Sequence, residues 1–192
     1  METILLVGPK HSGKTSAGRA LARIWAEENN QALPFTDLDE LVEARTGKSP
    51  RALYGEGPDI FRKAEAEALR ELFDREERGL RAVAAGGGLA DNGAAMDLLK
   101  DPSLKRSGRI FTVYLEVPAE TAWKRIEAAA EKTGEFPPFL KTGNPRETHR
   151  QLHLRRGAIY REIADLSLRA GESPEETAAL IARSFRQRNN HR

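Results

Sequence analysis

Short apolar runs alternate along this chain with longer segments in which apolar residues recur at helical spacing. Runs typical of strands buried on both faces occupy residues 3–7, 81–85 and 110–115. Two shorter candidate strands cover residues 32–35 and 166–168. Because strands and helices alternate, the pattern predicts a three-layer α/β/α fold with a mainly parallel sheet.

Helices are expected where apolar residues recur every three or four positions. This spacing predicts helices over the ranges 14–28, 40–45, 60–78, 119–132 and 151–164. A capping box with proline at the first helical position, Ser173-Pro174-Glu175-Glu176, opens a final helix. The polar tail over residues 186–192 is expected to be a frayed terminus.

One long segment, residues 133–149, interrupts the pattern. It is rich in glycine and proline and has few residues that could anchor a core. A loop of this length inside a compact domain is usually functional or disordered. We therefore expect a single domain over residues 1–192 with a mobile lid at about 133–149.

Composition excludes several classes of function. Hydrophobic residues make up 39% of the 192 positions and charged residues 31%, as in soluble globular proteins. The absence of cysteine excludes disulfides, thiolate metal sites and a cysteine nucleophile. A net charge of only +2 gives little support for nucleic-acid binding, and the apolar run 4–7 is too short for a signal peptide or a membrane span. We expect a cytoplasmic monomer with no nucleic-acid or membrane partner.

The residues between the first strand and the first helix carry the most specific motif. Gly8-Pro9-Lys10-His11-Ser12-Gly13-Lys14-Thr15 matches the P-loop pattern G-x-x-x-x-G-K-[ST]. Glycines let backbone amides surround phosphate oxygens, and the helix dipole favours an anion at this place. The alternative is a glycine turn with a surface lysine. The predicted ATP site consists of Gly8, Ser12, Gly13, Lys14, Thr15 and Ser16.

Within this loop, Lys14 is predicted to be an exposed catalytic residue that reaches the β- and γ-phosphates. Thr15 offers a hydroxyl group to Mg²⁺. Lys10 and His11 fill variable positions of the motif, and His11 is interpreted as a bystander. The fold class is therefore that of a P-loop NTPase.

Two carboxylates follow the second candidate strand. Asp37 and Asp39 are two residues apart, which on an extended segment would point them the same way. One could hold the metal through water, and the other could orient an acceptor hydroxyl group and take its proton. The alternative is a polar turn with a helix N-cap.

Two further features are candidates for the acceptor site. Arg62 could pair with a substrate carboxylate, or could be a solvated arginine with Glu65 as its i+3 partner. Gly86, Gly87 and Gly88 directly follow a candidate strand, where glycine is favoured if a backbone approaches a ligand closely. The alternative for the three glycines is a flexible turn.

Taken together, these motifs resemble the shikimate kinase family. The matching pieces occur in family order and include the P-loop, Asp37-x-Asp39, Gly47, Gly55-Glu56, Phe61-Arg62 with Glu65, Gly86-Gly87-Gly88, and Arg155-Arg156 before Tyr160-Arg161. The resemblance implies ATP-dependent phosphorylation of a ring hydroxyl on a small carboxylic acid, most simply shikimate. By the same resemblance, Asp39 is the base that contacts substrate hydroxyls, Asp37 lies near the metal, and Gly86–Gly88 line the pocket. Arg62 and Arg156 hold the carboxylate.

The chain departs from the family in the lid. The resemblance implies an arginine immediately before a proline–leucine pair, but Pro137 stands at that position. Lys132, Lys141 and Arg146 are candidate replacements. This departure leaves two alternatives open: a kinase for another hydroxy acid such as gluconate, and an inactive nucleotide-binding regulator.

Overall fold

The protein is an α/β structure built on a parallel sheet. The computed structural model describes residues 1–74, 79–171 and 173–190. Within these residues, five parallel strands pair in the order β2-β3-β1-β4-β5. The strands are β1 (Glu2–Val7), β2 (Phe35–Asp37), β3 (Leu80–Ala84), β4 (Ile110–Glu116) and β5 (Leu166–Arg169). The predicted fold class is confirmed.

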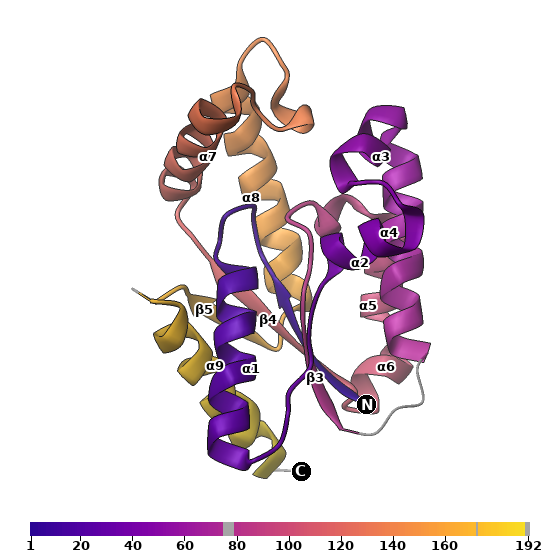
Figure 1. Ribbon diagram of the computed structural model, residues 1–192, viewed down its shortest axis with the longest axis vertical. Helices are drawn as coiled ribbons and strands as arrows, with labels where there is room; N and C mark the ends of the chain where they lie inside the picture. Colours follow the sequence, from indigo (N-terminus) through magenta and orange to yellow (C-terminus); the bar gives the residue numbers. More distant parts are fainter. Residues whose placement is uncertain (75–78, 172, 191–192) are drawn as a thin grey trace.

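Helices cover both faces of this sheet. They are α1 (Lys14–Asn29), α2 (Leu38–Thr46), α3 (Pro50–Glu56), α4 (Pro58–Asp74), α5 (Gly93–Lys100), α6 (Pro102–Arg106), α7 (Ala119–Thr133), α8 (Pro145–Ile163) and α9 (Pro174–Asn190), with 3₁₀ turns η1 (Leu89–Asp91) and η2 (Pro138–Leu140). Helices α1 and α9 lie on one face, and α4, α5 and α8 lie on the other (Figure 1).

The core consists of two apolar layers that share the strands. On β1, Leu5 and Val7 belong to the layer that contacts α4 and α5, while Ile4 and Leu6 belong to the layer that contacts α1 and α9. All four side chains are fully buried, which is the pattern of a strand covered on both faces. Consequently the P-loop, which follows β1, starts from the centre of the molecule.

Several predicted boundaries are wrong, each for a local reason. Strand β2 begins at Phe35 instead of residue 32, because Pro34 has no amide hydrogen for the sheet. Helix α8 begins at Pro145, inside the predicted irregular segment, and its N-cap Asn144 accepts a hydrogen bond from the Glu147 amide. In the predicted frayed tail 186–192, residues 186–190 are helical, and residues 191–192 lie outside the described residues. Residues 75–78 of the predicted helix 60–78 lie outside the described residues.

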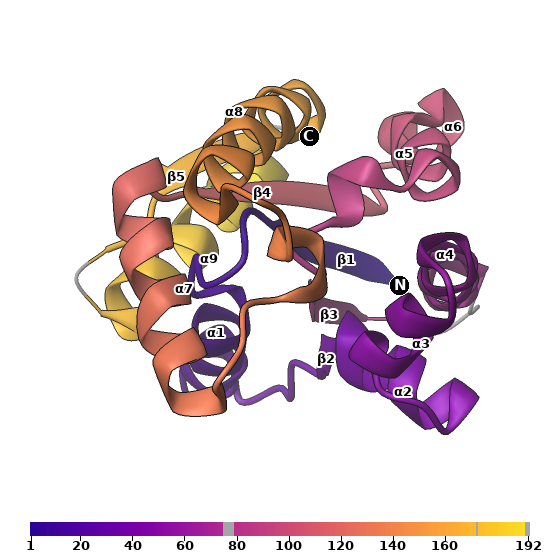
Figure 2. The same ribbon diagram turned by 90° about the horizontal axis from the view of Figure 1, so that it is seen from above.

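Within the predicted segment 133–149, residues 134–144 connect α7 to α8 and are called the lid segment below. Seen from above, it crosses the end of the sheet toward α2 and α3 (Figure 2). Its Phe136 ring stacks on Trp123 of α7, with centroids 5.6 Å apart, and Leu140 is fully buried beside Trp123. In the part of the chain that is described, no helix is long and apolar enough to span a membrane.

Candidate active site

The P-loop takes its shape from two glycines with left-handed backbone conformations. Gly8 has φ +149°, and a β-carbon there would lie 2.7 Å from the Leu115 carbonyl oxygen of β4. Gly13, with φ +92°, is the N-cap of α1. Since side chains are disfavoured at such φ values, glycine allows the loop to pass β4 and enter the helix. The helix therefore begins at Lys14 with its free amides facing the loop.

Lys14 is buried, contrary to the prediction of an exposed lysine. Its exposed fraction is 8%, and its ammonium group donates hydrogen bonds to the carbonyl oxygens of Gly8 (3.0 Å) and Pro9 (2.8 Å). Burial lowers its pKa to about 8. The ammonium group therefore lies inside the loop, with backbone carbonyl groups as its partners.

The hydroxyl group of Thr15 meets the first carboxylate of the predicted pair. Thr15 Oγ1 donates to Asp37 Oδ2 over 2.7 Å. The other oxygen of Asp37 accepts a hydrogen bond from the Asp39 amide over 3.0 Å, so Asp37 caps α2. The alternative of a helix N-cap is therefore confirmed for Asp37, and its contact with Thr15 also places it at the P-loop. Its role at a metal stays a prediction. The predicted extended geometry is wrong, because Asp39 lies in the first turn of α2.

Asp39 and Glu65 converge on Gly86. A β-carbon at Gly86 would lie 2.9 Å from Glu65 Oε1 and 3.0 Å from Asp39 Oδ1. Both of these carboxylate oxygens are buried, and neither has a hydrogen-bond partner among the described residues. Burial raises the pKa of both groups, that of Glu65 to about 7, and the charge of Asp37 adds to the rise at Asp39. Two acceptor atoms without donors therefore face the same space.

Arg156 and Arg62 supply positive charge near these carboxylates. Arg156 is 9% exposed and donates to Asp91 Oδ2 from Nε (3.1 Å) and Nη2 (2.7 Å). Arg62 Nη1 donates to Asp59 over 2.8 Å, so Glu65 is not the ion-pair partner of Arg62. Instead, Glu65 Oε2 accepts a hydrogen bond from Asn92 over 2.9 Å.

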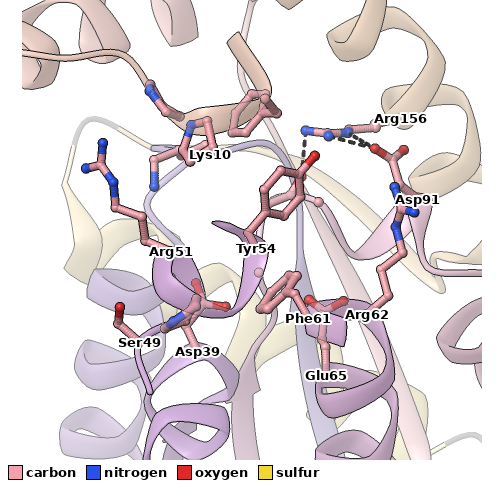
Figure 3. A pocket seen from close by; sticks show the side chains of 17 residues that line it. Lys10, Asp39, Ser49, Arg51, Tyr54, Phe61, Arg62, Glu65, Asp91 and Arg156 are labelled. Carbon is pink, nitrogen blue, oxygen red and sulfur yellow. Dashed lines mark hydrogen bonds and ion pairs between the residues drawn. The ribbon is translucent and has the colours of Figure 1, made fainter. Parts of the chain in front are cut away.

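Two adjoining cavities collect the predicted residues. The first, about 450 Å³, is lined by Gly13, Lys14, Thr15, Ser16 and Asp37, and is called the phosphate pocket. The second, about 310 Å³, contains Arg62, Glu65, Gly88, Asp91 and Arg156 and is called the acceptor pocket (Figure 3). Four residues line both pockets: Lys10, Asp39, Gly86 and Gly87. Gly8 and Ser12 shape the loop without lining either pocket.

Several residues that line the pockets were not predicted from the sequence, and Lys10, Arg125 and Asp91 are the most informative of them. Lys10 lines both pockets, although the motif leaves its position variable. Arg125 of α7 lines the phosphate pocket and donates to the His11 carbonyl over 2.7 Å. Asp91, three residues after Gly88, forms ion pairs with Arg155 and Arg156. An acidic residue so close to the glycines was the only available signal for Asp91.

The candidate lid cations lie outside both pockets. Lys141 pairs with Glu135 over 2.7 Å, and Arg146 pairs with Glu120 over 2.9 Å. Lys132 is exposed. None of these three cations is among the described residues that line the two pockets. Instead, Pro137, Pro138 and Phe139 line the acceptor pocket. Arg156 lies over the Phe139 ring, with Cζ 5.1 Å from its centroid. The lid segment therefore contributes apolar surface to this pocket.

Comparison with known proteins identifies the family. The family model described as shikimate kinase matches residues 10–186. Two similar relatives are shikimate kinases. That of Nitrosococcus oceani is 34% identical, with 96% of this chain and 87% of the relative covered, and that of Pseudomonas fluorescens is 35% identical, with 94% and 93% covered.

Solved structures of similar proteins support the same family. The shikimate kinase from Acinetobacter baumannii in complex with shikimate superimposes with a TM-score of 0.77 at 27% identity, covering 98% of this chain and 94% of that one. The shikimate kinase from Aquifex aeolicus gives a TM-score of 0.73 at 28% identity, with 97% and 98% covered. On these sequence and structural grounds, the chain belongs to the shikimate kinase family.

Proposed function

We propose that this protein transfers the terminal phosphoryl group of ATP to a hydroxyl group of shikimate, with the residues of the two pockets in the roles described below. The activity follows from membership of the shikimate kinase family, which is ATP-dependent. The observation that carries the assignment of residues is the pair of unpartnered oxygens on Asp39 and Glu65, which face a pocket beside the P-loop that is also lined by Arg51, Arg62 and Arg156.

ATP binds in the phosphate pocket in this proposal. Backbone amides of the loop Gly8, Ser12 and Gly13 and of the first turn of α1, with Ser16, surround the phosphate oxygens. Lys14 is a catalytic residue whose ammonium group exchanges its carbonyl partners for phosphate oxygens. Its burial in a site that excludes water strengthens this interaction.

The residues Thr15 and Asp37 fit a magnesium ion. A hydroxyl oxygen and a carboxylate oxygen lie 2.7 Å apart there, and oxygen donors of this kind are the ligands that Mg²⁺ prefers. The ion would neutralise charge on the phosphates, to which it binds together with one or two protein groups and water. We propose Thr15 and Asp37 as those groups.

Shikimate binds in the acceptor pocket. Asp39 accepts the proton of the attacking hydroxyl group and is the catalytic base, a role that its raised pKa favours. Arg62 and Arg156 hold the substrate carboxylate, because guanidinium groups bind carboxylates through paired hydrogen bonds. Gly86, Gly87 and Gly88 form the floor. A side chain at position 86 would displace Asp39 or Glu65, and one at position 87 would displace Lys10.

We extend the proposal to the chain as a whole. It is a monomeric cytoplasmic enzyme with one catalytic domain over residues 1–192, and it acts on a small molecule without nucleic-acid or membrane partners. The lid segment opens and closes over the acceptor pocket, which its residues Pro137 and Phe139 already line.

A coupled ADP-release assay with ATP, MgCl₂ and either shikimate or gluconate tests the proposed function. We expect shikimate to stimulate ADP release well above the rate without an acceptor. Stimulation by gluconate alone would instead favour the kinase for another hydroxy acid. ATP binding without stimulation by either compound would contradict the proposal and favour the nucleotide-binding regulator.

A further inference from the structure

The phosphoryl group must pass between the two pockets, so the residues that line both of them surround the point of transfer. These residues are Lys10, Asp39 and the backbone of Gly86 and Gly87. Asp39 has the base role in the proposed function. Lys10 is the cation that the described linings of the two pockets share, and no role has yet been given to it.

Lys10 differs from the neighbouring cations in having no partner. No described residue gives its ammonium group a hydrogen bond or an ion pair, and the residue is exposed. The other cations of the pockets are engaged. The engaged pairs are Arg51 with Glu135, Arg62 with Asp59, Arg156 with Asp91, Arg125 with the His11 carbonyl, and Lys14 with the loop carbonyls.

The position of Lys10 is fixed by close backbone contact with the glycine turn. A β-carbon on Gly87 would lie 2.6 Å from the Lys10 amide nitrogen and 2.9 Å from its Cα. Any other residue at position 87 would therefore push the P-loop away. The positive charge of Lys10 acts to lower the pKa of both Asp39 and Lys14, so Lys10 lies within electrostatic reach of the base and of the phosphate-binding lysine. Figure 3 shows Lys10 on the wall of the pocket that also holds Asp39 and Arg51.

We propose that Lys10 is a catalytic residue whose ammonium group neutralises the charge that develops on the phosphoryl group during transfer; this inference rests on the proposed function. The γ-phosphorus separates from the bridging oxygen, which leaves with the electron pair as part of ADP, and bonds to the acceptor oxygen, whose proton passes to Asp39. Lys10 exchanges no proton. Positive charge aimed at the equatorial oxygens stabilises such a transition state. Of the candidate lid cations, Lys141 pairs with Glu135 and Arg146 with Glu120, and neither is among the described residues that line the two pockets.

The test compares kcat and KM of the Lys10→Met variant with those of the wild type. Loss of one preorganised group that stabilises developing charge lowers kcat by about 100-fold to 1,000-fold. We expect that loss in Lys10→Met, with KM for ATP and for shikimate within about threefold of wild type, since the contact strengthens only in the transition state. Lys10→Arg should recover part of the activity. Lys63→Met, an exposed lysine of α4 outside both pockets, is the matched control and should be unchanged.

A binding measurement adds a readout that is independent of turnover. In MgCl₂, ADP with fluoroaluminate and shikimate should raise the melting temperature of the wild type above the shift caused by ADP alone. Lys10→Met should keep the shift caused by ADP and lose most of the additional shift. If wild type shows shikimate-dependent ADP release, full kcat in Lys10→Met overturns the inference and leaves the proposed function intact. A large loss of kcat in Lys141→Met, with no loss in Lys10→Met, would also overturn the inference and leave the proposed function intact. Wild type without any such release would overturn the proposed function itself.

Discussion

The carboxylate of Asp91 holds the guanidinium group of Arg156 through two hydrogen bonds, 3.1 Å from Nε and 2.7 Å from Nη2. Arg155 contacts the other oxygen of Asp91 over 2.8 Å. Burial raises the pKa of Asp91, but the hydrogen bonds and charges of the two arginines outweigh burial and hold that pKa below its ordinary value. Arg156, the arginine proposed to bind the substrate carboxylate, is therefore already paired with a carboxylate of the protein itself.

Replacing Asp91 with asparagine should lower the stability of the free protein and increase the stabilisation that shikimate gives. In Asp91→Asn, Arg156 remains buried without a full counter-charge, so the free protein should be less stable than wild type by roughly 1–3 kcal/mol. The carboxylate of shikimate can then supply the missing charge. We expect shikimate to raise the melting temperature of Asp91→Asn by more than it raises that of wild type. A smaller shift in the variant would mean that Asp91 chiefly orients Arg156 for the substrate.

The role of Lys14 is tested by Lys14→Met. Its ammonium group is already desolvated inside the loop, so a methionine of similar length should change the free energy of unfolding by only about 1 kcal/mol. Loss of its contact with the phosphates should lower kcat by about 1,000-fold. Urea unfolding and the ADP-release assay measure the two quantities, with Lys63→Met as the control. A variant that unfolds but retains its activity per folded molecule would disprove the assignment.

Arg62 should affect one substrate and spare the other. Its ion pair with Asp59 is exposed, so the guanidinium group can exchange that partner for a substrate carboxylate. Arg62→Ala should raise KM for shikimate by about 10-fold to 100-fold, the loss expected for a charged hydrogen bond, and change KM for ATP by less than about threefold. Asp59→Asn, which removes only the surface partner, should leave both KM values close to wild type. Equal losses for the two substrates in Arg62→Ala would contradict the assignment.

Glu65 makes stability depend on pH. Burial raises its pKa from 4.5 to about 7, so the folded state keeps a proton that the unfolded state has released between these values. Its contribution to stability is present below pH 4.5 and is lost as pH rises toward 7. From pH 4 to pH 8, the wild type should therefore lose roughly 3 kcal/mol of unfolding free energy relative to the Glu65→Gln variant.

Denaturant unfolding at a series of pH values measures this difference. Glu67→Gln is the control, because Glu67 lies on the exposed side of the same helix, α4. A difference between Glu65→Gln and wild type that stays constant across pH would show that Glu65 does not hold a proton in the folded protein.

The P-loop and the parallel sheet were predictable because their signals are local. A run such as residues 3–7 identifies a buried strand, and Gly8 and Gly13 lie at positions where the loop needs left-handed φ values. The predicted ends of elements were wrong where a helix cap or a proline determines where the element starts, as at Asn144 before α8. Short helices such as α3 are only seven residues long, which is too few for a periodic pattern to be recognised.

The missed parts of the site depend on contacts between segments that are distant in the chain. Asp91 and Arg156 are separated by 65 positions, and nothing near either residue indicates the pair. Lys10 acquires its place from Gly87, whose missing side chain lets two loops touch. Tertiary packing of this kind leaves no period or spacing in the sequence. Asp39, Arg62 and the three glycines were candidates from their own positions, but Arg156 could be added only through the family resemblance.

In the proposed reaction, the P-loop delivers the phosphoryl group to an acceptor that rests against Asp39, Arg62 and Arg156. The most direct measurement is ³¹P NMR of shikimate incubated with ATP, MgCl₂ and the protein. We expect a new phosphomonoester resonance that grows together with ADP and is absent with Lys14→Met. ADP and inorganic phosphate without a phosphomonoester, or no reaction at all, would contradict it.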